Sequence, residues 1–93
     1  MAVTKKTKQP SEVLDYDFKY TDWLDSGDEI ESAVITVAAG ITLDSYNIVS
    51  PGIVKVWLSG GTDGETYLIT CVATTEGGRE KEKEFKLKIK EVS

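Results

Sequence analysis

The feature that most constrains this chain is the alternation of apolar and polar residues in short segments. Near the start, the aromatic residues Tyr16, Phe18 and Tyr20 alternate with Asp15, Asp17 and Lys19. A period of two places the two sets on opposite faces of a β-strand and does not fit the 3.6-residue period of a helix. The pattern recurs along the chain and predicts an all-β fold.

The remaining predicted strands follow the same rule. The run 30–43 is rich in β-branched residues, which suit a pleated sheet better than a helix, and Gly40 divides this run into two strands. In all, strands are predicted within residues 12–20, 30–43, 53–59, 65–75 and 82–92, with turns at 50–52 and 76–79. Six or seven strands at intervals of about 8–12 residues indicate a β-sandwich.

The length of 93 residues suits a single domain. Residues 1–10 show no periodicity and are interpreted as a flexible N-terminal arm, followed by the sandwich domain over residues 11–93. No apolar run approaches the roughly 20 residues that span a bilayer, and no apolar segment follows the N-terminal lysines. Neither a membrane partner nor a secretory signal is therefore expected.

The net charge and the single cysteine limit which classes of partner and which chemistry fit this chain. The net charge of −5 argues against nucleic acid as the main partner. Cys71 is the single cysteine, so the fold has no intramolecular disulfide. Its place on the inward face of a predicted strand indicates a small buried apolar residue rather than a nucleophile.

No catalytic, cofactor-binding or metal site is predicted. The chain has no histidine, which removes the commonest general base and the usual zinc ligand. The acidic loop 21–29 contains Asp22, Asp25, Asp28 and Glu29, and their oxygens would suit calcium. Their spacing is not that of an EF-hand, so a solvated loop is favoured, while calcium binding stays open.

Tyr67 sharpens the fold prediction. The segment Asp63-Gly64-Glu65-Thr66-Tyr67 opens a strand and is similar to the tyrosine corner of immunoglobulin-like domains, in which the hydroxyl bonds to upstream backbone. Ile69 stands where disulfide-linked domains have cysteine. The prediction is an immunoglobulin-like β-sandwich without a disulfide, in which the Tyr67 hydroxyl satisfies a buried carbonyl.

Trp57 allows two interpretations. Together with Ile53 it falls on the opposite face of its strand from Val54, Val56 and Leu58, which would make an exposed contact patch. Alternatively, Trp57 points inward, as a buried tryptophan commonly does in immunoglobulin-like cores, and the valines pack elsewhere.

Five blocks of sequence carry a resemblance by their order and spacing. They are Glu12–Tyr16, Thr21–Leu24, Gly27–Ile30, Val56–Tyr67 and Gly78-Arg79. Together they resemble a family of small structural proteins of tailed bacteriophages, the tail or fibre-tail adaptor proteins, many of them prophage-encoded. The resemblance covers nearly all of the chain after residue 10.

The resemblance implies a non-catalytic virion protein, made in the host bacterial cytoplasm, that contacts other tail or virion proteins. It implies either a symmetric homo-oligomeric ring or a decoration on larger phage parts. By the same analogy, the contact candidates are Trp23 and Leu24 in one loop, and Gly60, Gly61 and Asp63 in another. The alternative is an immunoglobulin-like module of a bacterial surface protein that binds carbohydrate or protein.

Overall fold

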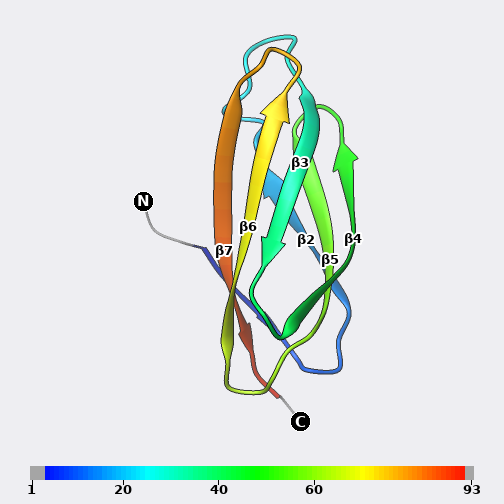
Figure 1. Ribbon diagram of the computed structural model, residues 1–93, viewed down its shortest axis with the longest axis vertical. Coiled ribbons are helices and arrows are strands. Elements are labelled where there is room, and N and C mark those ends of the chain that lie inside the picture. The colour runs from blue at the N-terminus through cyan, green and yellow to red at the C-terminus, as the bar shows by residue number, and fades with distance from the viewer. Residues whose placement is uncertain (1–3, 92–93) are drawn as a thin grey trace.

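The computed structural model describes residues 4–91, and these residues form seven strands in two facing β-sheets (Figure 1). Its strands are β1 (Thr4–Lys8), β2 (Leu14–Lys19), β3 (Ile30–Val37), β4 (Ile41–Val49), β5 (Ile53–Gly60), β6 (Thr66–Thr75) and β7 (Glu80–Ile89). The described residues include no helix, and hence none that could cross a membrane. The prediction of an all-β sandwich without a disulfide is confirmed.

The strand order places β6 and β7 inside one sheet and β5 inside the other. The four-stranded sheet has the order β1-β7-β6-β3, and the three-stranded sheet has the order β2-β5-β4. Neighbouring strands are antiparallel, except that β1 runs parallel to β7. Immunoglobulin-like sandwiches group their C, F and G strands and their B, E and D strands in the same way, which supports that interpretation.

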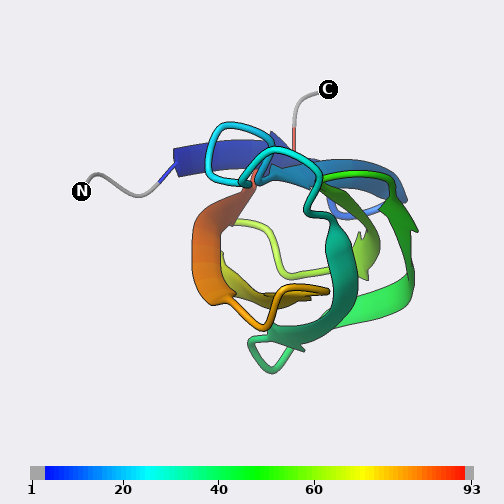
Figure 2. The same cartoon turned by 90° about the horizontal axis from the view of Figure 1, so that it is seen from above.

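The core forms where the two sheets present their inward residues to each other, and Figure 2 shows both sheets curving around it. Val54, Val56 and Leu58 of β5 are fully buried. Aromatic rings fill the β2 side of the core. The Phe85 ring centroid lies 5.4 Å from that of Tyr16 and 5.1 Å from that of Phe18. Such tilted ring contacts add to the stabilisation that burial itself provides.

Tyr20 joins the two sheets. It directly follows β2, and its fully buried hydroxyl donates a hydrogen bond of 2.9 Å to the carbonyl of Cys71 on β6. Burial, together with this bond, holds the pKa of Tyr20 well above its ordinary value. Burial also raises the pKa of the Cys71 thiol, as expected of an inert core residue.

The structure corrects the prediction of a flexible arm for residues 4–8. They form β1, which lies at the edge of its sheet, so parallel pairing with β7 orders it despite the lack of apolar alternation. Lys8 faces inward and is buried, and its Nζ donates to the carbonyls of Gln9 (2.6 Å) and Pro10 (3.3 Å). Burial lowers the pKa of Lys8. Residues 1–3 of the predicted arm lie outside the described residues.

The strand after Gly40 extends further than predicted. The sequence places its end at residue 43, whereas β4 continues to Val49 with a bulge between Leu43 and Ser45. The added segment lies at a sheet edge and is mostly exposed on both faces, so it lacks the alternation that marks a half-buried strand.

Tyr67 closes the loop before β6 in a way that differs in one respect from the prediction. The backbone N–H of Thr62 donates to the Tyr67 hydroxyl at 3.0 Å. The hydroxyl thus contacts upstream backbone, as in a tyrosine corner. Its partner here is an amide that donates, rather than a carbonyl that accepts.

Replacing Tyr20 with Phe should lower the free energy of unfolding by about 1–2 kcal/mol, because the Cys71 carbonyl would stay buried without this donor. The matched control is Tyr46→Phe, since Tyr46 is exposed on β4 and the same atom is removed there. Chemical denaturation of both variants measures the difference. Equal stabilities would show that the hydroxyl does not join the sheets.

Replacing Tyr67 with Phe should cost about 1 kcal/mol, because the Thr62 amide loses its acceptor in a partly buried loop. Amide hydrogen exchange at Thr62 should accelerate in this variant. A stability change below a few tenths of a kcal/mol, with unchanged exchange, would argue against the corner.

Candidate contact surfaces

The contact residues predicted from the sequence lie on three separate parts of the molecule. Trp23 and Leu24 belong to the β2–β3 loop at one end of the sandwich (Figure 1, top). Gly60 ends β5, and Gly61 and Asp63 follow it in the β5–β6 connection at the opposite end. Ile53 and Trp57 lie on the outer face of the three-stranded sheet. The structure therefore does not bring all of them into one site.

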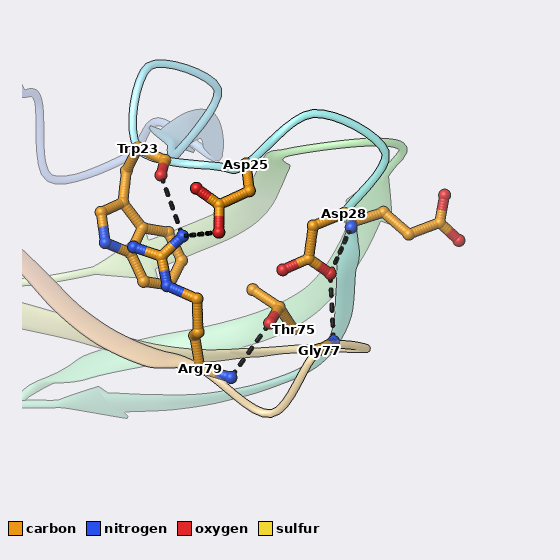
Figure 3. A network of polar contacts seen from close by, with 7 residues as sticks. Trp23, Asp25, Asp28, Thr75, Gly77 and Arg79 are labelled. Atoms are coloured by element: carbon orange, nitrogen blue, oxygen red, sulfur yellow. Dashed lines mark hydrogen bonds and ion pairs between the residues drawn. The ribbon is translucent and has the colours of Figure 1, made fainter.

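Trp23 is held by Arg79 of the β6–β7 hairpin, as Figure 3 shows. The Arg79 guanidinium carbon lies 4.3 Å from the centroid of the Trp23 ring. Its Nη1 lies 3.0 Å from Asp25 Oδ2 and donates a 3.4 Å hydrogen bond to the Trp23 carbonyl. Stacking and ion pairing with one guanidinium thus join the loop to the hairpin.

Asp28 makes a second link between the same loop and hairpin. Its Oδ1 accepts hydrogen bonds from the N–H groups of Glu29 (2.9 Å) and Gly77 (3.1 Å) (Figure 3). Desolvation pushes the Asp28 pKa up, but hydrogen bonds from Thr75 and from these two amides outweigh it and hold the pKa below its ordinary value. Among residues 4–91, no group of three acidic, histidine or cysteine side chains is arranged to hold a metal ion.

Leu24 packs toward the β4–β5 turn. A Cβ built on Gly52 would lie 2.7 Å from Leu24 Cδ1, so only glycine leaves room for Leu24 at this turn. Both Trp23 and Leu24 are half-buried against the core. This loop closes one end of the sandwich, so its apolar residues have a structural role whether or not they also touch a partner.

The β5–β6 connection closes the other end. Gly61 has a φ of +98°, and a Cβ on it would lie 2.6 Å from Ile89 Cγ1. Asp63 Oδ1 accepts a 2.9 Å hydrogen bond from the N–H of Glu91. Gly61 therefore allows a tight approach of the loop to the last strand, and Gly60 supplies the positive φ of +81° at its start.

Trp57 faces solvent, which settles the two interpretations left by the sequence. Its side is opposite to that of the fully buried Val54, Val56 and Leu58, and Trp57 itself is 38% exposed. In the sheet it lies between Asp15 of β2 and Ser45 of β4. The apolar neighbours along this face are half-buried Ile53 and exposed Val49, which pair across the strands.

A charge cluster lies between the apolar ends of this face. Lys55 Nζ lies 2.9 Å from Asp15 Oδ2 and 3.2 Å from Asp17 Oδ1. The hydrogen bond from Lys55 is the main cause that lowers the pKa of Asp15, and the same bond raises the pKa of Lys55. The contact with Asp17 is an ion pair without hydrogen-bond geometry, since within the described chain Asp17 Oδ1 accepts no hydrogen bond.

We call this surface the β5 face and define it as Asp15, Asp17, Val49, Ile53, Lys55 and Trp57. It combines an exposed tryptophan on a central strand with a lysine that pairs with two aspartates. Exposed Lys19 of β2, opposite Ile53, borders this face and has no ion-pair partner within residues 4–91. Such an arrangement suits the apolar centre of a protein–protein contact.

Sequence reasoning placed Ile53, Lys55 and Trp57 on this face, with Ile53 and Trp57 as the contact candidates, but it did not place the other three residues there. The charges lie on two different strands, and only the pairing of β2 with β5 brings them together. Lys55 could be placed because residues two apart in a strand point to the same side, and Lys55 lies between Ile53 and Trp57. Val49 carried no such signal in its unpredicted edge segment.

Comparison with known proteins identifies the family. A family model described as podophage GP4 fiber-tail adaptor protein gp77 matches residues 8–88, which extend from the last residue of β1 into β7. No curated protein matches the chain.

Replacing Arg79 with Met should lower the free energy of unfolding by about 1 kcal/mol, because the stacking on Trp23 is lost. Lys90→Met removes one positive charge at an exposed position near the other end of β7 and serves as the control. Urea denaturation compares the two variants. If they are equally stable, the contact with Trp23 does not hold the loop.

Proposed function

Because the chain belongs to the podophage GP4 fiber-tail adaptor protein family, we propose that it is a non-catalytic structural component of the virion that connects tail parts by protein–protein contact. Its partners are other tail or virion proteins. On this proposal the chain is made in the cytoplasm of the host bacterium and is then incorporated into the phage tail.

The exposed side chain of Trp57 is the observation that carries the choice of contact surface. It projects from the central strand of its sheet, so pairing on both sides fixes its backbone. Tryptophan is enriched among the residues that dominate binding energy, because it covers a large area at a small cost in side-chain entropy. The β5 face thus offers a rigid apolar anchor to a partner with a complementary pocket.

The charges on the β5 face favour docking rather than oppose it. Asp15 and Asp17 already pair with Lys55, so a partner that covers them does not bury an uncompensated lysine. The indole N–H of Trp57 donates to no acceptor within residues 4–91. A matching partner surface should therefore combine an apolar pocket with a hydrogen-bond acceptor at its edge.

The two end loops are secondary candidates for contact. Trp23, Leu24, Gly60, Gly61 and Asp63 all have structural roles in closing the sandwich. A ring of several copies is a further part of the proposal. It would repeat the β5 face around a tail axis and so present several equal anchors to the neighbouring tail protein.

Incorporation into phage particles tests this proposal. The gene would be deleted from the phage or prophage that encodes it and replaced with wild type, Trp57→Ser or Val13→Ser. Val13 is exposed in the β1–β2 connection, outside the β5 face, and so controls for the loss of an exposed apolar side chain. Mass spectrometry of purified particles measures the copies of the chain relative to the other tail proteins.

Wild type and Val13→Ser should be incorporated at one fixed ratio, and Trp57→Ser should fall at least tenfold, as expected when a tryptophan anchor is removed. Thermal unfolding of the purified variants confirms that each is folded. Absence of the wild-type chain from intact particles would overturn the virion role. Normal incorporation of Trp57→Ser would overturn the β5 face as the contact and leave the virion role standing.

A further inference from the structure

The outer face of the four-stranded sheet separates its charges into two bands. On β7, the outward residues Glu80, Glu82 and Glu84 are followed by Lys86 and Lys88, and all five are exposed. Lys5 of β1 pairs with Lys86 and is also exposed, which widens the basic band. One end of this face is therefore acidic and the other end is basic.

Apolar side chains lie between the bands on the neighbouring strands. Leu68 of β6 pairs with Lys86 and is 42% exposed, and Val72 of β6 pairs with Glu82. Val34 of β3 pairs with Val72 and is 66% exposed, the largest exposure of any large apolar residue described. Apolar side chains thus lie on each side of the level of Glu84 and its partner Thr70, Val34 and Val72 on one side and Leu68 on the other.

The charges of both bands lack ion-pair partners of their own. Within residues 4–91, no carboxylate lies within 4.0 Å of Lys5, Lys86 or Lys88, and no lysine or arginine lies within that distance of Glu80 or Glu82. Lys88 donates only to a backbone carbonyl, that of Gly64, at 3.2 Å. The contrast with the internally paired β5 face is direct, and it leaves these charges free to pair with another molecule.

We propose that this face binds the same face of a second copy, with the strands of the two copies antiparallel. The two-fold axis would lie between the sheets, perpendicular to the strands, at the level of Glu84 and Thr70. Each residue above this level then faces a residue equally far below it in the other copy. Glu82 faces Lys86 of the second copy, Glu80 faces Lys88, and Val72 faces Leu68. Glu84, at the level of the axis, faces Glu84 of the second copy, so one like-charge contact stands against the four opposite-charge contacts that symmetry gives.

Charge selects this orientation over the alternative. A two-fold axis along the strands would also place face on face, but it would bring the acidic band of one copy against the acidic band of the other. The antiparallel arrangement instead forms each Glu82–Lys86 contact twice, as symmetry requires. Face-to-face sheets pack about 10 Å apart with a crossing of about 30°, which long Glu and Lys side chains can span at the rim.

The area of the face sets the strength of the contact. From strand spacings of about 4.8 Å and residue spacings of about 3.3 Å, a patch over β3, β6 and residues 80–88 of β7 covers about 400 Å² per copy. The total is below the roughly 1,200 Å² of a stable interface. We therefore expect a weak, salt-sensitive dimer in solution, which a high local concentration in a virion would strengthen.

Charge reversal on the purified full chain tests the proposal. Glu82→Lys and Lys86→Glu each place like charges opposite one another in both symmetric contacts. Each variant alone should dimerise at least fivefold more weakly than wild type in sedimentation velocity at low salt. Asp44→Lys changes the net charge as Glu82→Lys does, but it lies on exposed β4 of the other sheet and should leave the dimer within twofold of wild type.

Mixing the two single variants is the decisive step. Glu82→Lys carries positive charge at both positions and Lys86→Glu carries negative charge at both, so the mixture should form a heterodimer that neither variant forms with itself. The double variant Glu82→Lys/Lys86→Glu should recover wild-type self-association, because the swap restores each opposite pair.

Three outcomes would overturn the antiparallel dimer. They are a wild type that stays monomeric at millimolar concentration, a mixture without heterodimer, and a double variant as weak as either single one. Trp57→Ser should dimerise as wild type does, since Trp57 lies on the other sheet. The dimer and the proposed role of the β5 face therefore succeed or fail separately.

Discussion

The buried hydroxyl of Tyr20 is the contact on which the arrangement of this sandwich depends. No disulfide crosses the core, so a directional link between the sheets has to come from a hydrogen bond, and Tyr20 donates one to the Cys71 carbonyl at 2.9 Å. The backbone of the same residue accepts from Trp23 and Leu24 and donates to the Gly52 carbonyl. One residue thus fixes the distance between the sheets, starts the β2–β3 loop and holds the β4–β5 turn.

This anchoring explains why the conspicuous tryptophan of the β2–β3 loop is less free than it looks in the sequence. Trp23 follows Tyr20 by three residues, and its ring packs between the Tyr20 ring and the Arg79 guanidinium. Its apolar surface is mostly used within the molecule. Trp57 instead lies on the outer side of a strand whose opposite side is fully buried, and it remains 38% exposed. Of the two tryptophans, Trp57 is the better anchor for a partner.

Most of the fold could be predicted from the sequence, and the exceptions share a physical cause. Strands with one buried face, such as β6 and β7, show alternation because the core selects their inward residues. Residues 4–8 and 44–49 belong to edge strands that sheet pairing orders, so their sequences carry little of that pattern. The direction of Trp57 could not be predicted because both faces of β5 carry large apolar residues. The pairing of Lys55 with Asp15 depends on which strands are neighbours, and the alternation of residues within one strand does not reveal its neighbours.

The two outer faces of the sandwich differ in whether their charges are paired within the chain. This difference fits the two kinds of contact proposed above. On the β5 face, Lys55 is neutralised within the chain, so the proposed contact would rest mainly on apolar shape. On the other face, Glu82 and Lys86 lie four residues apart on one strand, too far apart to form an ion pair with each other. A second, inverted copy would bring Lys86 opposite Glu82. The β5 face is suited to a different protein, and the outer face of the four-stranded sheet is suited to a second copy of this chain. Because the sheets stand back to back, both contacts can form at the same time.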